Sequence, residues 1–191
     1  MTTLPIYLAS KSPRRRMLLR KLGMKFKSLP PNISEDIKEK NPKLLAIKLA
    51  QLKVASVEKK IRRGIVVGVD TIVVINGKIL GKPRNKEDAR RMLYLLNGKE
   101  HKVISGICIL RKPYYSLIST AELTTVKFRK LSNHEIEKYL RTKEPYDKAG
   151  AYGIQGRAGF FIEKINGCYF NVVGLPIAKL LNSLAKLTKV Y

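Results

Sequence analysis

The sequence has few acidic residues, no tryptophan, and little cysteine or histidine. Its 191 residues include 39 Lys+Arg but only 14 Asp+Glu, 2 His and 2 Cys, and its formal net charge is +25. Cys108 and Cys168 form no Cys-x-x-Cys pair and stand beside no histidine. This pattern argues against a disulfide framework or a zinc site, and it predicts two buried or half-buried thiols in a reducing, cytoplasmic setting.

Long apolar runs are also missing. No stretch approaches the roughly 18 uninterrupted apolar residues of a membrane helix, and the first ten residues lack the apolar centre of a signal peptide. We therefore expect no membrane association. The hydrophobic fraction of 45% nevertheless excludes a wholly disordered basic tail. The length favours a single domain over residues 1–191, large enough to bury a core.

Strand-like apolar segments alternate with helical patterns along the chain, which predicts a mixed α/β fold. Asn76-Gly77 and Asn166-Gly167 indicate two hairpins, so we do not expect a purely parallel sheet. The expected strands are 4–9, 65–75, 78–80, 103–110, 117–128, 160–165 and 168–172, and the expected helices are 13–22, 42–61, 85–96, 133–141 and 176–186.

The first candidate site is a basic turn between a strand and a helix. Ser12 and Pro13 are typical of a helix start, and Arg14, Arg15 and Arg16 follow directly. Cations in a first turn oppose the helix dipole, whereas the helices expected after Asn85 and Ser132 begin with acids. The turn therefore predicts a bound anion, with a solvated basic surface as the alternative.

The second candidate is Asp70, the only charged residue in the apolar segment 65–75. A carboxylate there must be paired, bound to a metal or shifted in pKa, unless it lies at the strand end and accepts from backbone amides. Thr71 adds a neighbouring hydroxyl. Lys53 lies on the long expected helix, where a lysine is ordinarily a surface residue.

Three further segments are weaker candidates. Lys82 lies in a turn with Arg84, and two cations in a turn are by themselves weak evidence for a binding site. Glu35 belongs to a rare acidic patch that would either bind a metal or compensate local charge. Gln155 lies in the glycine-punctuated segment 146–157, which is typical of a ligand-shaping loop, and its amide could read the edge of a planar ring. An ordinary surface loop is the alternative.

Six collinear motifs resemble those of the Maf family of nucleoside triphosphate pyrophosphatases. They are SxSPRR at 10–15, VVGVDTIV at 66–73, GKP at 81–83, SG at 105–106, DKAGAYGIQG at 147–156 and NVVGLP at 171–176. The resemblance covers nearly the whole chain. Lys11 and Phe170 are departures, because the family has small residues at both positions, and neither departure affects the catalytic acid.

The resemblance implies a Maf/inosine-triphosphatase-like fold, with a mixed elongated sheet, flanking helices and two lobes around a cleft. It also implies hydrolysis of a nucleoside triphosphate to the monophosphate and pyrophosphate with Mg²⁺ or Mn²⁺. The family's catalytic acid corresponds to Asp70. The family's phosphate and metal contacts correspond to Ser10, Arg15, Glu35, Lys53 and Lys82, with Glu35 and Asp70 as the metal ligands.

The positions that track substrate choice in the family are Arg14, Thr71 and Gln155 here. This set resembles the subfamily acting on dTTP, UTP and modified pyrimidine triphosphates. Enzymes of the family with a different base preference, or an inosine-triphosphatase-like enzyme, are the alternatives within the same class. Dimers are common in the family, so a homodimer is a further expectation.

A nucleic-acid-binding protein is the alternative from another class, and the net charge of +25 is its whole support. Such a protein usually shows aromatic residues interleaved with basic ones, or a recognisable binding motif. The sequence has 7% aromatic residues and no such motif. We therefore expect a nucleotide rather than a nucleic acid as the partner.

Overall fold

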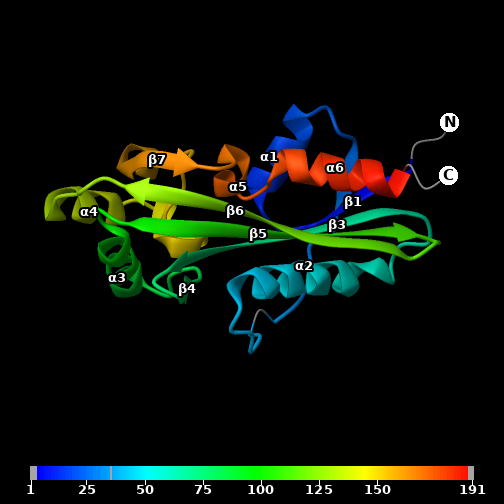
Figure 1. The fold of residues 1–191 in the computed structure, drawn as a ribbon, viewed down its shortest axis with the longest axis horizontal. Coiled ribbons are helices and arrows are strands. Elements are labelled where there is room, and N and C mark those ends of the chain that lie inside the picture. The colour runs from blue at the N-terminus through cyan, green and yellow to red at the C-terminus, as the bar shows by residue number, and fades with distance from the viewer. Residues whose placement is uncertain (1–3, 35, 189–191) are drawn as a thin grey trace. The chain divides into compact units, whose positions relative to one another are not determined.

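The computed structural model describes residues 4–34 and 36–188 and has a mixed α/β architecture (Figure 1). The strands are β1 (Ile6–Ala9), β2 (Phe26–Ser28), β3 (Gly64–Ile75), β4 (Lys78–Leu80), β5 (Glu100–Lys112), β6 (Ser116–Phe128) and β7 (Ile162–Asn166). The α-helices are α1 (Pro13–Lys21), α2 (Pro42–Glu58), α3 (Lys86–Leu96), α4 (Asn133–Leu140), α5 (Tyr169–Val173) and α6 (Ile177–Thr188). Three short 3₁₀ helices follow α4, namely η1 (Glu144–Asp147), η2 (Ala149–Ala151) and η3 (Arg157–Phe161).

The seven strands form one sheet in the order β2-β1-β3-β5-β6-β7, with β4 paired to β3. β1 is parallel to both β2 and β3, whereas the β3–β4 and β6–β7 pairs are antiparallel. The sheet is therefore mixed, as predicted, and of the two hairpin signals Asn76-Gly77 joins an antiparallel pair. Asn76-Gly77 forms the β3–β4 turn with both residues at positive φ, which suits asparagine and glycine.

The chain divides into two compact units, which agrees with the two lobes expected from the resemblance. Unit 1 comprises Met1–Asp70, Ser105–Glu122 and Gly174–Tyr191, and unit 2 comprises Thr71–Ile104 and Leu123–Val173. The long strands β3, β5 and β6 contribute residues to both units. Each unit has its own apolar core.

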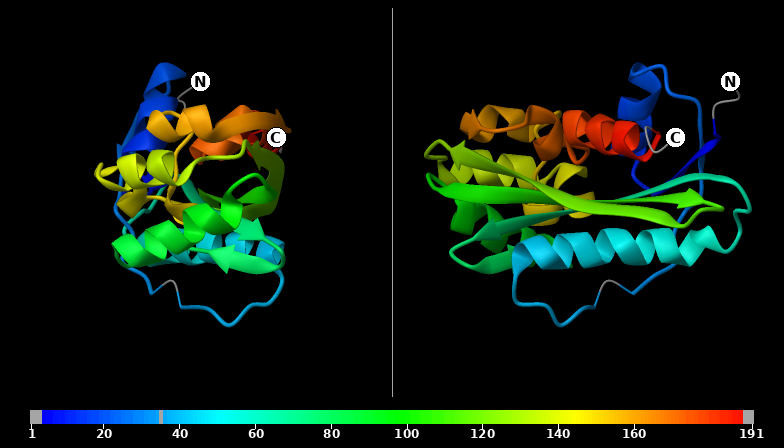
Figure 2. Two further views of the ribbon diagram at one scale, coloured as in Figure 1. Left: turned by 90° about the vertical axis from the view of Figure 1, so that its left-hand side faces the viewer. Right: turned by 45° about the vertical axis from the view of Figure 1, so that its right-hand side comes forward.

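In unit 1, α2 lies along one face of the strands and α6 along the other (Figures 1 and 2). Two glycines allow α2 to lie unusually close to the strands. A Cβ on Gly68 would stand 2.4 Å from the carbonyl oxygen of Ala50, and one on Gly106 would stand 2.1 Å from that of Ala46. Because any side chain at these positions would force α2 away, the glycines set how deep its inner residues lie.

The core of unit 2 is centred on Phe128, which is fully buried between strands and helices. Its ring makes edge-to-face contacts with His101, Tyr152 and Phe161, at centroid distances of 5.0, 4.8 and 6.0 Å. Burial of one such aromatic side chain contributes about 2–3 kcal/mol to stability. Leu93 and other residues of α3 and α4 complete this core.

One predicted element is wrong. The segment after Asn166-Gly167 does not return as a strand but forms the short helix α5, and β7 pairs with β6 instead. Asn171 explains the difference, because its buried side-chain amide donates to the carbonyl of Val103 and to Thr124 Oγ1, both at 3.0 Å. A buried amide needs such partners, and the helical turn brings it to them. The three-residue strand β2 was not predicted at all.

The two cysteines are as expected from the sequence. Cys108 is buried, Cys168 is half-buried, and neither is in a disulfide. Burial raises the pKa of the Cys108 thiol, although a hydrogen bond with Ser119 opposes the effect. In the part of the chain that the structure describes, no helix is long and apolar enough to cross a bilayer.

His101 gives a first prediction, because its imidazole is buried in the unit 2 core and its Nε2 lies 2.7 Å from the Tyr152 hydroxyl. Burial lowers the pKa of His101 from 6.5 to about 4. Between these values the unfolded chain binds a proton that the folded chain does not, so stability falls as the pH falls. At pH 4.5 the loss should reach about 2.5 kcal/mol relative to pH 7.5.

The measurement is urea unfolding of the wild type and of His101→Gln, which cannot titrate, between pH 7.5 and 4.5. Acid also protonates carboxylates, but it does so in both proteins. The difference in unfolding free energy between them should therefore shrink by about 2.5 kcal/mol towards pH 4.5. A difference that stays constant across this range would contradict the assignment to His101.

Candidate active site

The first part of the site is the turn between β1 and α1 in unit 1. Ser10 Oγ accepts a hydrogen bond from the Ser12 backbone N–H at 3.1 Å, and Ser12 Oγ accepts from the Arg15 N–H at 3.4 Å. Ser12 is thus the N-cap of α1 and Pro13 its first residue, as predicted from the sequence. The turn collects hydroxyls and backbone donors at the start of a helix.

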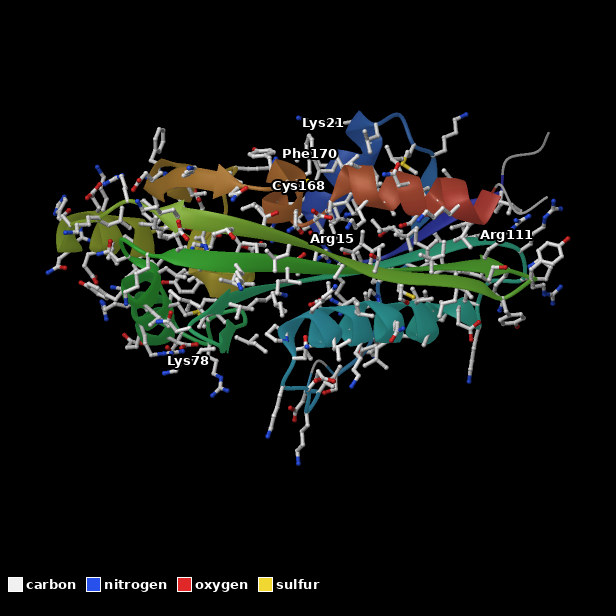
Figure 3. All side chains as sticks on the ribbon, in the orientation of Figure 1. Arg15, Lys21, Lys78, Arg111, Cys168 and Phe170 are labelled. Carbon is white, nitrogen blue, oxygen red and sulfur yellow. The ribbon has the colours of Figure 1, made fainter. Side chains whose placement is uncertain are left out.

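Arg15 is the fixed cation of this turn and is only 9% exposed. Its Nε donates to the carbonyl oxygen of Gly174 at 2.8 Å, and its Nη1 donates to Ser10 Oγ at 3.4 Å. Figure 3 shows Arg15 close to the beginning of α6. Arg14, on the same turn, is half-buried. A guanidinium and hydroxyls held together at a helix N-terminus suit an anionic oxygen.

The absence of an acid in the first turn does not by itself distinguish α1. The helix α2 also begins without one and carries Lys43 there. α3 and α4, by contrast, begin with Glu87 and Asp88 and with Glu135, as predicted. What distinguishes α1 is that one of its first-turn cations is buried and held by backbone and hydroxyl partners.

The second part of the site in unit 1 is the ion pair between Lys53 Nζ and Asp70 Oδ1. Each residue is 7% exposed. Asp70 is thus paired, which is one of the alternatives expected for a carboxylate in an apolar strand. The ordinary interpretation of Lys53 as a surface lysine is wrong for this protein.

The close approach of α2 explains the burial of Lys53. Gly68 and Asp70 are two residues apart on β3, so they lie on the same face of the strand. A Cβ on Gly68 would meet Ala50 and Val54 of α2, and Lys53 lies between these two in sequence. The missing side chain at Gly68 thus brings this turn of α2, with Lys53, against the face that carries Asp70.

Three other predicted residues, Thr71, Lys82 and Gln155, belong to unit 2. Thr71 follows Asp70 directly and is half-buried, whereas Lys82 and Gln155 are exposed. The Gly150 N–H donates to the carbonyl of Gly81 at 3.0 Å. This bond joins the turn that carries Lys82 to the loop that carries Gln155, so the structure brings these two motifs together.

Glu144 holds the loop that carries Gln155 through hydrogen bonds, and the sequence did not identify it as a site residue. Its carboxylate accepts from the Arg157 N–H at 3.0 and 3.2 Å. Lys148 Nζ donates to the backbone carbonyl of Glu144 at 2.6 Å and to Asp147. Glu144 precedes the motif at 147–156, and no pattern in the sequence marks it.

Of the two expected metal ligands, the structure describes only Asp70, and Glu35 lies outside the described residues. Across residues 4–34 and 36–188, no group of three or more His, Cys, Asp or Glu side chains could hold a metal ion. Asp70 alone suits a cation such as Mg²⁺, which commonly takes one or two protein carboxylates and completes its shell with phosphate oxygens and water.

Comparisons with known proteins agree with the sequence motifs. A family model described as Maf-like protein matches residues 5–187. Curated proteins named dTTP/UTP pyrophosphatase are similar to this chain. The one from Carboxydothermus hydrogenoformans is 48% identical over 179 residues, which cover 94% of this chain and 96% of the relative. The one from Thermosipho africanus is 51% identical and covers 94% of this chain and 91% of the relative. The one from Thermococcus onnurineus is 49% identical and covers 90% of this chain and 92% of the relative.

The buried ion pair gives a second prediction. Lys53→Met leaves the Asp70 carboxylate buried without its cation, and loss of one partner of a buried pair costs about 3–5 kcal/mol. The double variant Lys53→Met with Asp70→Asn removes both charges and should recover at least half of that loss. Urea unfolding at pH 7.5 measures all three proteins. A double variant no more stable than Lys53→Met would show that the charge of Asp70 is not the cause.

Proposed function

The chain belongs to the Maf-like family, and from this membership we infer that it hydrolyses pyrimidine nucleoside triphosphates, dTTP and UTP among them, to the monophosphate and pyrophosphate. The observation that carries the inference is the buried group of Ser10, Arg15, Lys53 and Asp70 in unit 1. Ser10, Arg15 and Asp70 belong to sequence motifs shared with the family, and Lys53 contacts one of these motifs through Asp70. They combine fixed cations with a carboxylate, which the reaction requires.

The reaction is attack of water on the α-phosphorus, which forms a new P–O bond and breaks the bond to the bridging α–β oxygen. Pyrophosphate leaves with the electron pair of that bond. We propose that Asp70 acts as general base and takes the proton of the attacking water. Since Lys53 already pairs with Asp70, the carboxylate is held in a fixed position rather than free to rotate.

The phosphate charge needs cations that are in place before the reaction, because fixed charges cost no reorganisation in the transition state. We propose that Arg15 and Ser10 contact phosphate oxygens and that Arg14 adds a second guanidinium. Lys53 contributes positive charge beside Asp70. In unit 2, we propose a phosphate contact for Lys82, and base selection by Gln155 together with Thr71.

We also propose a divalent cation, Mg²⁺ or Mn²⁺, with Asp70 and Glu35 as its protein ligands. The cation would neutralise phosphate oxygens and polarise the α-phosphorus when bound. The support is the chemistry of Asp70, a carboxylate beside cations that suit phosphate, because Mg²⁺ takes phosphate oxygens as ligands. Among the described residues, no group of three or more His, Cys, Asp or Glu side chains could bind the cation without the substrate's phosphate oxygens.

A third prediction tests the reaction itself. With dTTP or UTP and Mg²⁺, the enzyme should release pyrophosphate and monophosphate in equal amounts, and chelation of the metal should stop the release. Asp70→Asn should lower kcat by at least about 100-fold, because general-base catalysis contributes at least this much. Ion-exchange chromatography of the products measures both outcomes, and a panel of purine triphosphates tests the base preference.

Two results would contradict this proposal at different points. Release of inorganic phosphate in place of pyrophosphate would exclude cleavage of the α–β bond. Near-wild-type turnover by Asp70→Asn, with metal binding intact, would exclude the general-base role while leaving the overall reaction standing.

A fourth prediction concerns base selection by Gln155. Gln155→Glu exchanges a side-chain donor for a negative charge, so kcat/KM for UTP should fall about tenfold or more. Gln51→Glu is the matched control, since Gln51 lies in unit 1, donates to Ser119 Oγ and has no proposed role. Steady-state kinetics on UTP and dTTP measure both variants. Equal losses in the two variants would contradict a base-reading role for Gln155.

A further inference from the structure

Three segments that are distant in sequence meet at one end of unit 1. They are the end of α2 with the residues after it (58–63), the β5–β6 turn (111–116) and the last residues of α6 (186–187). Lys112 Nζ donates to the backbone carbonyl and the carboxylate of Glu58, both at 3.0 Å. Arg111 Nη1 donates to the carbonyl of Leu187 at 2.8 Å. We name these three segments the basic tip; Figure 3 labels Arg111 within it.

The basic tip is strongly positive. Within its three segments Glu58 is the only carboxylate, and it is already engaged by Lys112. The side chains of the other cations apart from Arg111 are exposed. They are Lys59, Lys60, Arg62, Arg63 and Lys186. Since the one carboxylate is paired, these exposed charges are available to a polyanion.

Two tyrosines stand among these cations. Tyr114 and Tyr115 are 61% and 64% exposed. The Arg111 guanidinium lies 5.1 Å from the centroid of the Tyr114 ring, and the Lys112 ammonium lies 5.1 Å from that of Tyr115. Cation–π contacts of this kind hold the rings in place without burying them. The basic tip therefore presents two aromatic rings together with cations.

The backbone at Tyr115 indicates that the ring is not there to make the turn. Its φ is 52°, a left-handed conformation that glycine and asparagine adopt readily and a tyrosine rarely does. The ring packs into no core, since most of its surface is exposed. A residue that strains the turn and buries little contributes to folding only through its contact with Lys112, which points to a role in binding.

The basic tip is separate from the candidate active site. Ser10 follows the carboxyl end of β1, whereas Arg62 and Arg63 precede the amino end of β3. Because β1 and β3 are parallel, with Ile6 opposite Ile65 and Ala9 opposite Gly68, these are opposite ends of the two strands. The hydrolysis proposed above uses none of the basic-tip residues.

We propose that the basic tip binds single-stranded nucleic acid, with Tyr114 and Tyr115 stacking on bases and the surrounding cations contacting phosphates. Exposed aromatic rings on a basic surface are the features with which proteins bind single strands without sequence preference. An anionic lipid surface would satisfy the charges and would also accept tyrosine rings at its headgroup level, so vesicles are part of the test. A duplex would also satisfy the charges, but its bases are stacked on one another and offer no free faces.

The test is a titration of a fluorescently labelled 20-nucleotide single strand, followed by anisotropy at 50 and 150 mM salt. Tyr115→Gly should bind about tenfold or more weakly, since stacking on one base is removed. It should also unfold at about the same urea concentration as the wild type, because relief of the positive φ offsets the lost contact with Lys112. Phe160→Ala is the matched control, since Phe160 is 81% exposed in unit 2.

The charge contribution is tested by reversing Arg62 and Arg63 together to Glu. This variant should bind more weakly and should show a shallower salt dependence, by about 0.7 in the log–log slope for each phosphate that the protein no longer neutralises. Lys99→Glu with Lys102→Glu is the control with the same change of net charge, on exposed lysines of unit 2. It should retain most of the affinity and the wild-type slope.

Three results would overturn the proposal. These are equal affinity for a duplex of the same length, loss of affinity in both charge-reversal variants alike, or wild-type binding by Tyr115→Gly. Binding to phosphatidylserine vesicles without binding to the single strand would assign the basic tip to membranes instead. Hydrolysis of dTTP and UTP should stay at the wild-type rate in every tip variant, so this proposal and the proposed function fail separately.

Discussion

The packing of α2 against the strands of unit 1 is the constraint on which the candidate site depends. Gly68 and Gly106 allow the helix backbone to reach the strands, and this approach buries Lys53 against Asp70. A buried lysine or aspartate alone would be costly, since each would lose its hydration without a counter-charge. The pair is therefore tolerated because its members meet, and their meeting fixes the position of the carboxylate.

The same reasoning separates two kinds of cation in a chain of net charge +25. Arg15 and Lys53 are buried, and backbone, hydroxyl or carboxylate oxygens hold each in place. Most other lysines and arginines are exposed on helices and turns. Exposed cations attract any polyanion through a field that salt screens, whereas fixed buried ones can select one geometry. Lys112 is equally buried, but it pairs with Glu58 in the basic tip. Burial together with position beside Ser10 or Asp70, more than charge, therefore marks the residues suited to chemistry.

Local signals predicted much of the fold. The caps at Ser12, Asn85 and Ser132 and the apolar strand containing Asp70 are all present, because each depends on neighbours within a few residues. The failures depend on distant partners. Nothing near Lys53 in sequence reveals that Gly68 will lie beneath its helix. The Asn166-Gly167 pair indicated a hairpin, but the partners of Asn171 on β5 and β6 favour a helical turn.

The basic tip also depends on residues that are distant in sequence, so its proposed function was not predicted from local patterns. Along the linear sequence, aromatic and basic residues are not interleaved in the way that is typical of nucleic-acid binding, because the parts of the tip come from three separate segments. Arg111 and Lys112 adjoin the two tyrosines in sequence. Folding then brings Lys112 to Glu58 and Arg111 to Leu187, which adds the exposed cations of 59–63 and Lys186 to the same surface. Within unit 1, the buried residues suited to phosphate and the exposed surface suited to a longer polyanion therefore lie at opposite ends of β1 and β3. Both depend on lysine and arginine, but the first holds its cations in fixed positions and the second leaves most of its cations exposed.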